Sequence, residues 1–368
     1  MQNPKKKKPK LRYILFGILG VFLILVCYLF FHDPGIPVNT WKPDDRFSVQ
    51  DSQRTVIDPA VLLSLDIAPY KNPETVQVRD GWVYAAVEGG NIIRIREDGM
   101  GLEQVLHTGG AILGFDLDTQ GNLYFCDCSY QGAPAICKYD GQNIHPLIIP
   151  HLTYPDALCL DEANGLLYFS NVTCVNPVAY RCTPQEAYTI DMMAHANTGS
   201  IECFDLNTWE LRTVADGFCF ANGIQLTKDG QYLLVNETSE NHVWRIDLTS
   251  GEKTILLTVP GYPDNLHAAG DGFWSGLAGL YAPAYANLAD KPLLRKAITN
   301  LPVSILSSIS GSAGGKDMAF IKYDEEGTVL AYNIVEGIGF TTTGAVETET
   351  RIYLETLGNV SKIYYYEK

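Results

Sequence analysis

The sequence predicts an all-β fold, a six-bladed β-propeller, with an N-terminal transmembrane helix in front of it. A pattern of short strands repeats six times after residue 60, long helical periodicity is scarce there, and one uncharged apolar run lies near the start. Hydrophobic residues make up 46% of the 368 residues and charged residues only 19%. The chain therefore has enough apolar side chains for a core and is not a disordered protein.

The apolar run covers residues 13–31, and its 19 residues would span about 30 Å as a helix. Residues 1–12 carry six positive charges, and no acidic residue precedes Asp33. The positive-inside tendency therefore predicts a cytoplasmic basic tail over 1–12 and a single-pass membrane anchor over 13–31. The propeller would lie on the periplasmic, lumenal or extracellular side. A cleaved signal peptide is the alternative, but its apolar part normally has about 7–15 residues and ends in small ones.

The formal net charge is −15, from 27 basic and 42 acidic side chains. Because six of the basic residues lie in the tail, the remainder has 21 basic and 42 acidic side chains, a net charge of −21. Nucleic-acid binding needs a basic surface on the folded part, so no nucleic-acid partner is expected. Three prolines in residues 32–47 indicate a linker between the anchor and the propeller.

Each repeated unit has a polar or small residue at its head, an alternating strand, a Gly-containing turn and an aromatic-rich strand, and a further strand follows. Four short strands every 40-odd residues, with longer insertions in two copies, are typical of a propeller. We therefore predict one ring over residues 48–368, in which residues 48–70 supply a closing strand to the last blade. A β-sandwich of unrelated hairpins is the alternative, but it does not predict a polar residue at the head of every unit. The six copies begin at residues 72, 111, 154, 220, 262 and 342.

The residues at the heads of the six units should converge on the ring axis, because the first strand of each blade lines the central channel. Carboxylate and amide oxygens predominate among them, and calcium takes six to eight such ligands. Cysteine and paired histidine are missing at these positions, which weighs against zinc or copper. Capping of local turns by each side chain is the alternative. The head positions are Glu74, Leu113 with Gly114, Asp156, Asn222, Asp264 with Asn265, and Thr343.

The segments 217–248 and 261–277, with their F-A-N-G and Y-P-D-N motifs, resemble the strictosidine-synthase-like family and the adipocyte plasma-membrane-associated protein family. The chain is more distantly similar to paraoxonases and gluconolactonases, and the resemblance covers roughly residues 60–368. It implies a six-bladed propeller with one calcium ion in the central channel and an arylesterase or lactonase activity. The implied metal ligands are Glu74, Asn222, Asp264 and Asn265.

Several positions depart from these families. The resemblance places the catalytic glutamate of strictosidine synthase at Thr343, which argues against that condensation chemistry, and the two paraoxonase histidines at Leu113 and Cys128. Asp156 remains as a candidate general base. His267 is a second candidate, because it lies two residues after Asn265 on an alternating strand and should share its face.

Two functions follow from these residues. The first is a membrane-anchored, calcium-dependent hydrolase of esters or lactones, in which a metal-activated water attacks a small-molecule substrate and Asp156 or His267 accepts its proton. The second is a non-catalytic ligand-binding propeller with a structural calcium, which the missing histidine pair favours.

Eight of the nine cysteines lie between residues 126 and 219, and an exported domain could form disulfides among them. Cys174 and Cys182 bracket a loop and are the preferred pair. The stretch 282–310 has helical periodicity, which predicts a lid, a membrane-facing helix or an ordinary packed insertion.

Overall fold

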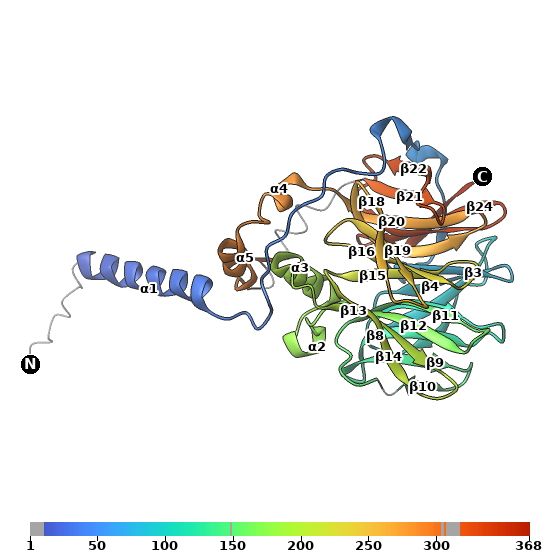
Figure 1. Ribbon diagram of the computed structural model, residues 1–368, viewed down its shortest axis with the longest axis horizontal. Coiled ribbons are helices and arrows are strands. Elements are labelled where there is room, and N and C mark those ends of the chain that lie inside the picture. Colours follow the sequence, from blue (N-terminus) through green and yellow to red (C-terminus); the bar gives the residue numbers. More distant parts are fainter. Residues whose placement is uncertain (1–10, 148, 303–304, 307–316) are drawn as a thin grey trace, which may run out of the picture.

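The computed structural model describes residues 11–147, 149–302, 305–306 and 317–368, so most of the predicted basic tail lies outside the described residues. The described chain forms six sheets arranged as a ring, with helices gathered at one side (Figure 1). Helix α1 (Leu11–Phe31) extends away from that side. The predicted all-β, six-bladed propeller is confirmed.

The first three blades follow one another along the chain as four-stranded antiparallel sheets. In each of them the first strand of the blade is the innermost and the fourth is the outermost. Their strands are β3 (Thr75–Arg79), β4 (Trp82–Val87), β5 (Asn91–Arg96) and β6 (Glu103–His107); β7 (Ile112–Leu117), β8 (Leu123–Tyr130), β9 (Ala133–Tyr139) and β10 (Ile144–Leu147); and β11 (Pro155–Asp161), β12 (Leu166–Asn171), β13 (Gly199–Asp205) and β14 (Leu211–Phe218).

The last three blades repeat this order, except that the N-terminal segment adds strands to two of them. Blade 4 is regular, blade 5 has a fifth strand, and blade 6 takes its outermost strand from the start of the domain. Their strands are β15 (Ala221–Leu226), β16 (Tyr232–Glu237), β17 (His242–Asp247) and β18 (Lys253–Thr258); β19 (Gly261–Ala269), β20 (Gly272–Leu280), β21 (Met318–Tyr323), β22 (Val329–Val335) and β1 (Arg54–Val56); and β23 (Thr341–Glu347), β24 (Arg351–Leu357), β25 (Lys362–Glu367) and β2 (Leu63–Asp66).

The ring is closed by β2, which pairs antiparallel with β25. This confirms the closing strand that the sequence predicted within residues 48–70. Strand β1, flanked by the 3-10 turns Asp51–Gln53 and Pro59–Val61, instead pairs in parallel with β22 of blade 5, a pairing that the sequence did not predict.

The hydrophobic core lies between neighbouring blades. Val83 and Ile93 of blade 1 pack against Tyr353 and Ile363 of blade 6, and equivalent clusters fill the other boundaries between blades. Since each blade buries both faces against its neighbours, the ring is one domain despite its length.

Two long connections carry helices to the side of the ring on which the first strands begin. The connection between β12 and β13 contains α2 (Pro177–Tyr180) and α3 (Pro184–Ala194), and the connection between β20 and β21 contains α4 (Pro283–Ala286) and α5 (Pro292–Thr299). We call these two connections the canopy. The helical part of the predicted insertion 282–310 is confirmed where the structure describes it.

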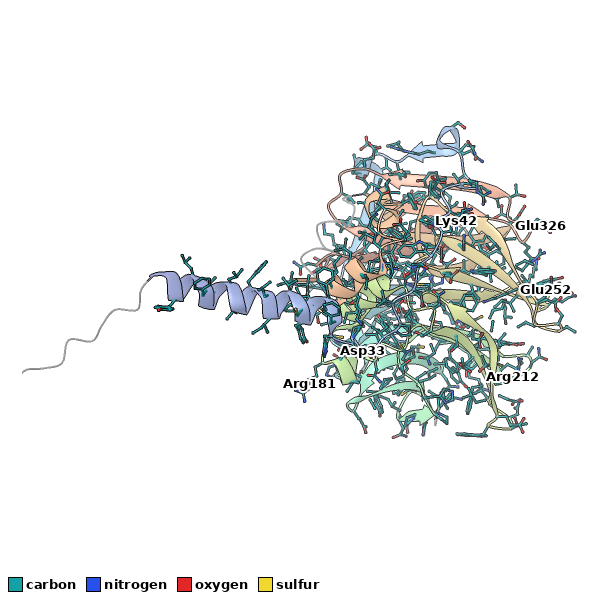
Figure 2. All side chains as sticks on the ribbon, turned by 60° about the vertical axis from the view of Figure 1, so that its left-hand side comes forward. Asp33, Lys42, Arg181, Arg212, Glu252 and Glu326 are labelled. Atoms are coloured by element: carbon teal, nitrogen blue, oxygen red, sulfur yellow. The ribbon has the colours of Figure 1, made fainter. Side chains whose placement is uncertain are left out.

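The predicted linker follows the surface of the propeller as a strap, which we define as residues 33–49. Asn39 donates its backbone N–H to the carbonyl of Ala194 at 3.0 Å, and Ser48 donates to the carbonyl of Thr258 at 2.8 Å. Ile36 and Val49 are buried in the cores beneath. Figure 2 shows Asp33 and Arg181 at the base of α1, while Arg212, Glu252 and Glu326 lie on the opposite side of the ring.

Helix α1 has 21 residues and exposes large apolar side chains, among them Phe16, Ile24 and Phe31. Among the residues that the structure describes, no helix combines the length and the apolar character needed to cross a membrane.

The ring axis leaves no room for a Cβ atom at Gly223, where such an atom would meet the backbone oxygen of Asp264 in the next blade. We expect Gly223→Ala to lower the free energy of unfolding by about 1–3 kcal/mol or more, because neighbouring strands would have to separate. Thermal unfolding of the full chain measures the change.

Gly270→Ala is the matched control, because nothing lies within 4 Å of its added Cβ and its backbone is in an ordinary conformation. Equal stability of the two variants would contradict the close approach of the backbones at the axis.

Candidate functional site

The head positions predicted from the sequence coincide with β-bulges. In five of the six blades the register between the first and second strands shifts at that point, and in blade 1 Glu74 lies directly before a regular strand. A bulge bends its strand and re-aims the side chains around it, which explains how these residues reach the axis. The shifts fall between Ile112 and Phe115, Pro155 and Leu158, Ala221 and Ile224, Pro263 and Leu266, and Thr342 and Gly344.

The predicted ligands from three blades are linked by hydrogen bonds. The Nδ2 of Asn222 donates to Oδ1 of Asp264 at 2.6 Å, while Oδ1 of Asn222 is buried and has no hydrogen-bond partner among the described residues. The Nδ2 of Asn265 donates to the backbone oxygen of Glu74 at 2.8 Å, and Oγ1 of Thr343 donates to the same oxygen at 2.8 Å. The structure thus brings together all four predicted metal ligands.

Burial shifts the acids of this cluster toward their neutral forms. It raises the pKa of Asp156 to about 7. It raises the pKa of Asp264 well above the usual range, an effect that Asp156 adds to and the amide of Asn222 opposes. It also raises the pKa of Glu74, with further increases from Asp156 and Asp264. Buried acids that repel one another favour either protonation or a bound cation.

The donor set fits a hard cation. Carboxylate and amide oxygens are the ligands that calcium takes, and the unpaired Oδ1 of Asn222 is available for such a contact. Among the residues that the structure describes, no three His, Cys, Asp or Glu side chains meet closely enough to form a metal site by themselves. The amide oxygens of Asn222 and Asn265 would therefore have to complete the ligand set.

His267 lies farther along the channel and pairs with Glu355. It lines a cavity of about 230 Å³ together with Asn265, as their predicted common face requires. Its Nε2 lies 2.8 Å from Oε1 of Glu355. Burial by itself would lower the pKa of His267, but Glu355 and Asp116 raise it above the usual range. The imidazole is therefore held in the channel by an acid that the sequence analysis did not single out.

The canopy covers the head side of the ring with an apolar and aromatic layer. Tyr154 of the ring and Tyr188 of α3 both contact Phe220 edge to face, with ring centroids 5.7 and 4.9 Å apart. Burial raises the pKa of Tyr154, and Asp156 raises it further; burial also raises the pKa of Tyr188, to which Asp264 contributes. Both hydroxyl groups are therefore close enough to the buried acids to interact with them electrostatically.

A fully buried arginine joins the canopy to the strap. The guanidinium of Arg295 on α5 donates to the carbonyls of Met193 and Ala194 at 3.0 and 3.1 Å, and to the carbonyl of Asn39 in the strap. It also lies 4.6 Å from the ring centroid of Trp41. Carbonyls at the C-terminal end of α3 carry partial negative charge, so they stabilise the buried cation without an acidic partner.

Neither residue at the paraoxonase histidine positions offers a base. Leu113 is buried in the apolar layer under the canopy. The thiol of Cys128 donates to the carbonyl of Pro155 at 3.3 Å, and burial raises its pKa well above the usual range.

The predicted disulfide between Cys174 and Cys182 is wrong, because both are free thiols. The two cysteines flank helix α2. Burial raises the pKa of the Tyr180 hydroxyl, and both cysteines lie close enough to raise it further.

Sequence reasoning missed two parts of the site. Glu355 lies on the second strand of blade 6, whereas only first strands were expected to reach the channel. Helix α3 was not predicted, although Thr183 and Glu186 form a capping box at its start that is visible in the sequence.

The comparisons with known proteins agree with these features. The profile of the strictosidine synthase family matches residues 156–250, and the N-terminal profile of the strictosidine synthase-like proteins matches residues 61–95. Strictosidine synthase-like protein 13 of Arabidopsis thaliana is 27% identical over 215 residues, which are 57% of this chain and 52% of that protein. The adipocyte plasma membrane-associated protein of Salmo salar is 22% identical over 322 residues, which are 78% of this chain and 72% of that protein.

The resemblance to the strictosidine-synthase-like proteins is thus confirmed, and the chain spans about half the length of the first of these relatives. Among solved structures, a putative gluconolactonase superposes with a TM-score of 0.54 at 14% identity and covers 90% of this chain and 97% of its own. A luciferin-regenerating enzyme gives 0.53 at 12% identity, covering 83% and 95%. These likenesses confirm the propeller fold.

The raised pKa of Asp156 predicts a pH-dependent stability in the presence of a chelator. Folded Asp156 keeps its proton up to about pH 7, whereas an unfolded aspartate releases it near pH 3.9. The folded state thus binds more protons in this window, so its contribution to the free energy of unfolding falls as the pH rises. Asp156→Asn should remove this part of the slope.

Thermal unfolding of both proteins between about pH 4.5 and 7.5 provides the measurement. Asp191 titrates alike in both proteins and cancels in the difference, whereas Glu74 and Asp264, whose pKa values Asp156 raises, contribute to the same change in slope. Parallel stability profiles would contradict the assignment.

Proposed function

We propose that this chain is a calcium-dependent hydrolase of esters or lactones that reacts at the axis of the propeller. The observation that carries the proposal is a cluster of buried acids, turned inward by β-bulges, with the unpaired amide oxygen of Asn222 among them. One of the solved structures of the same fold is named a putative gluconolactonase, and lactone hydrolysis is the same reaction class.

The metal would be held by Glu74, Asn222, Asp264 and Asn265. Calcium, when bound, supplies a Lewis acid that polarises a substrate carbonyl and stabilises negative charge on its oxygen. The hydrogen bond from Asn222 to Asp264 and the one from Asn265 to the backbone of Glu74 hold the donor groups in fixed positions before any ligand arrives.

Asp156 is the residue that we assign as general base. It is buried beside the other acids, and in the metal-free protein burial raises the pKa of its carboxyl to about 7, nearer to neutral pH than that of an exposed aspartate. Its role is to accept a proton from the attacking water. His267 is the second candidate, and its imidazole lies in the same channel with Nε2 2.8 Å from Oε1 of Glu355.

The substrate should carry an apolar or aromatic group. Tyr154, Tyr188 and Phe220 present an aromatic layer directly above the buried acids, and this layer also excludes water from the site. We therefore expect the apolar part of a small-molecule ester or lactone to contact this layer, with its carbonyl toward the axis.

A non-catalytic ligand-binding propeller is the second candidate function. Leu113 and Cys128 at the positions of the paraoxonase histidines favour it, as does the burial of the site beneath the canopy. Calcium would then have a structural role or orient a bound ligand.

We further propose that residues 13–31 anchor the protein in a membrane, with the basic tail in the cytoplasm and the propeller on the opposite side. The uncharged apolar sequence and the exposed apolar side chains of α1 support this assignment. The anchor is independent of the hydrolase proposal and is tested separately.

Asn222→Ala should abolish calcium-dependent hydrolysis, because it removes both the unpaired amide oxygen and the hydrogen bond to Asp264. We expect kcat/KM for aryl esters and lactones to fall about a hundredfold or more, since the lost stabilisation amounts to several kcal/mol. The assay uses the purified full chain with a substrate panel, in calcium and in chelator.

Asn333→Ala is the matched control, because Asn333 is a buried amide on the outer strand β22, away from the axis.

Asp156→Asn should lose turnover and retain calcium binding. If the wild-type protein hydrolyses nothing but melts at a higher temperature with calcium, the binding propeller is the correct function.

Leu19→Arg combined with Leu23→Arg should release the protein from membranes. Each arginine near the centre of a span costs about 3 kcal/mol, and both leucines are exposed on α1. Extraction of isolated membranes with alkaline carbonate measures the effect. Leu293→Arg on α5 is the control for an exposed leucine outside α1, and extraction of the wild-type chain would refute the anchor.

A further inference from the structure

Glu355 is a fully buried carboxylate that reaches the channel from the second strand of its blade. Its cross-strand partner on the innermost strand is Gly344, and a Cβ atom at Gly344 would overlap Oε2 of Glu355. Because Gly344 has no side chain, it leaves the space that the side chain of Glu355 occupies to reach the channel. The backbone of Glu355 is fixed in turn, because Oγ1 of Thr342 donates to its carbonyl at 2.7 Å.

Both carboxylate oxygens of Glu355 are already engaged. Oε1 accepts from the backbone N–H of Val76 in blade 1 at 2.5 Å and lies 2.8 Å from Nε2 of His267 in blade 5. Oε2 accepts from Nδ2 of Asn265 at 3.0 Å. A carboxylate with both oxygens committed to protein donors is suited to orienting its neighbours, and less suited to being a metal ligand.

The contact with Asn265 decides which way its amide points. A carboxylate only accepts hydrogen bonds, so it selects the NH₂ group of Asn265, and the backbone oxygen of Glu74 selects the same group at 2.8 Å. The amide oxygen is then the end of Asn265 that remains for another partner.

We propose that Glu355 is a positioning residue of the cation site, which fixes the amide of Asn265 with its oxygen available to the ion. This inference rests on the calcium site proposed above. The alternative is that Glu355 only ties blades 1, 5 and 6 together at the closure of the ring.

Loss of one acceptor oxygen separates the two roles. Glu355→Gln retains the size of the side chain but leaves one acceptor oxygen where the N–H of Val76 and the NH₂ group of Asn265 use two, so the amide of Asn265 is held less firmly. A purely structural Glu355 would affect the melting temperature in chelator and leave the calcium affinity unchanged.

Calcium binding to the full chain in detergent micelles is measured by titration calorimetry. We expect E355Q to weaken the binding of calcium about tenfold or more, as loss of an orienting partner typically does. E347Q is the control, because Glu347 is an acid of the same blade whose partners are Lys322 and Lys368. It should reduce the melting temperature in chelator without changing calcium affinity.

Glu355→Asp keeps both acceptor oxygens but withdraws them from Asn265, so it should weaken binding even where E355Q does not fold. Wild-type affinity in E355Q or E355D overturns the positioning role. A wild-type chain that binds no calcium overturns the cation site itself, which is a different result.

Discussion

The close approach of polypeptide backbones around the ring axis is the constraint on which the site depends. Gly114, Gly223 and Gly344 lie at the head of their blades, and in each case a Cβ atom would meet atoms of a neighbouring strand. Because glycine has no side chain, neighbouring first strands can converge while the adjacent bulge turns a polar residue inward. The same geometry that closes the ring thus concentrates acids in a space closed to most water.

That concentration has an electrostatic cost. Glu74, Asp156, Asp264 and Glu355 are mutually repulsive when ionised, and His267 is the base paired with one of them. Amide groups reduce the cost because they donate to specific oxygens and thereby fix the orientation of each acid. A divalent cation would remove the repulsion, which is why we connect the chemistry of the chain to calcium. The canopy strengthens these interactions by keeping the site dry.

Most of the ring could be predicted from the sequence because each repeated unit places its strands and its polar residue in the same order. A polar residue at the same point of successive units identifies Asp156, Asn222 and Asp264 without knowledge of the bulges that aim them. Glu355 could not be found in this way, because it reaches the axis from a second strand through the gap at Gly344, which is a cross-strand relation. The path of the strap was equally hidden, since its contacts are mainly to backbone atoms distant in sequence.

The pairing of β25 with β2 has a consequence for synthesis on the ribosome. Strand β2 ends at Asp66, and its partner β25 begins only at Lys362. A nascent chain can stack its blades in order, but the opening between blade 6 and blade 1 persists until β25 has left the exit tunnel. Val76, Asn265 and His267 receive their common partner Glu355 only at this last stage. A chain stalled before that point would present the channel acids as an open arc to the solvent, with no enclosed axis.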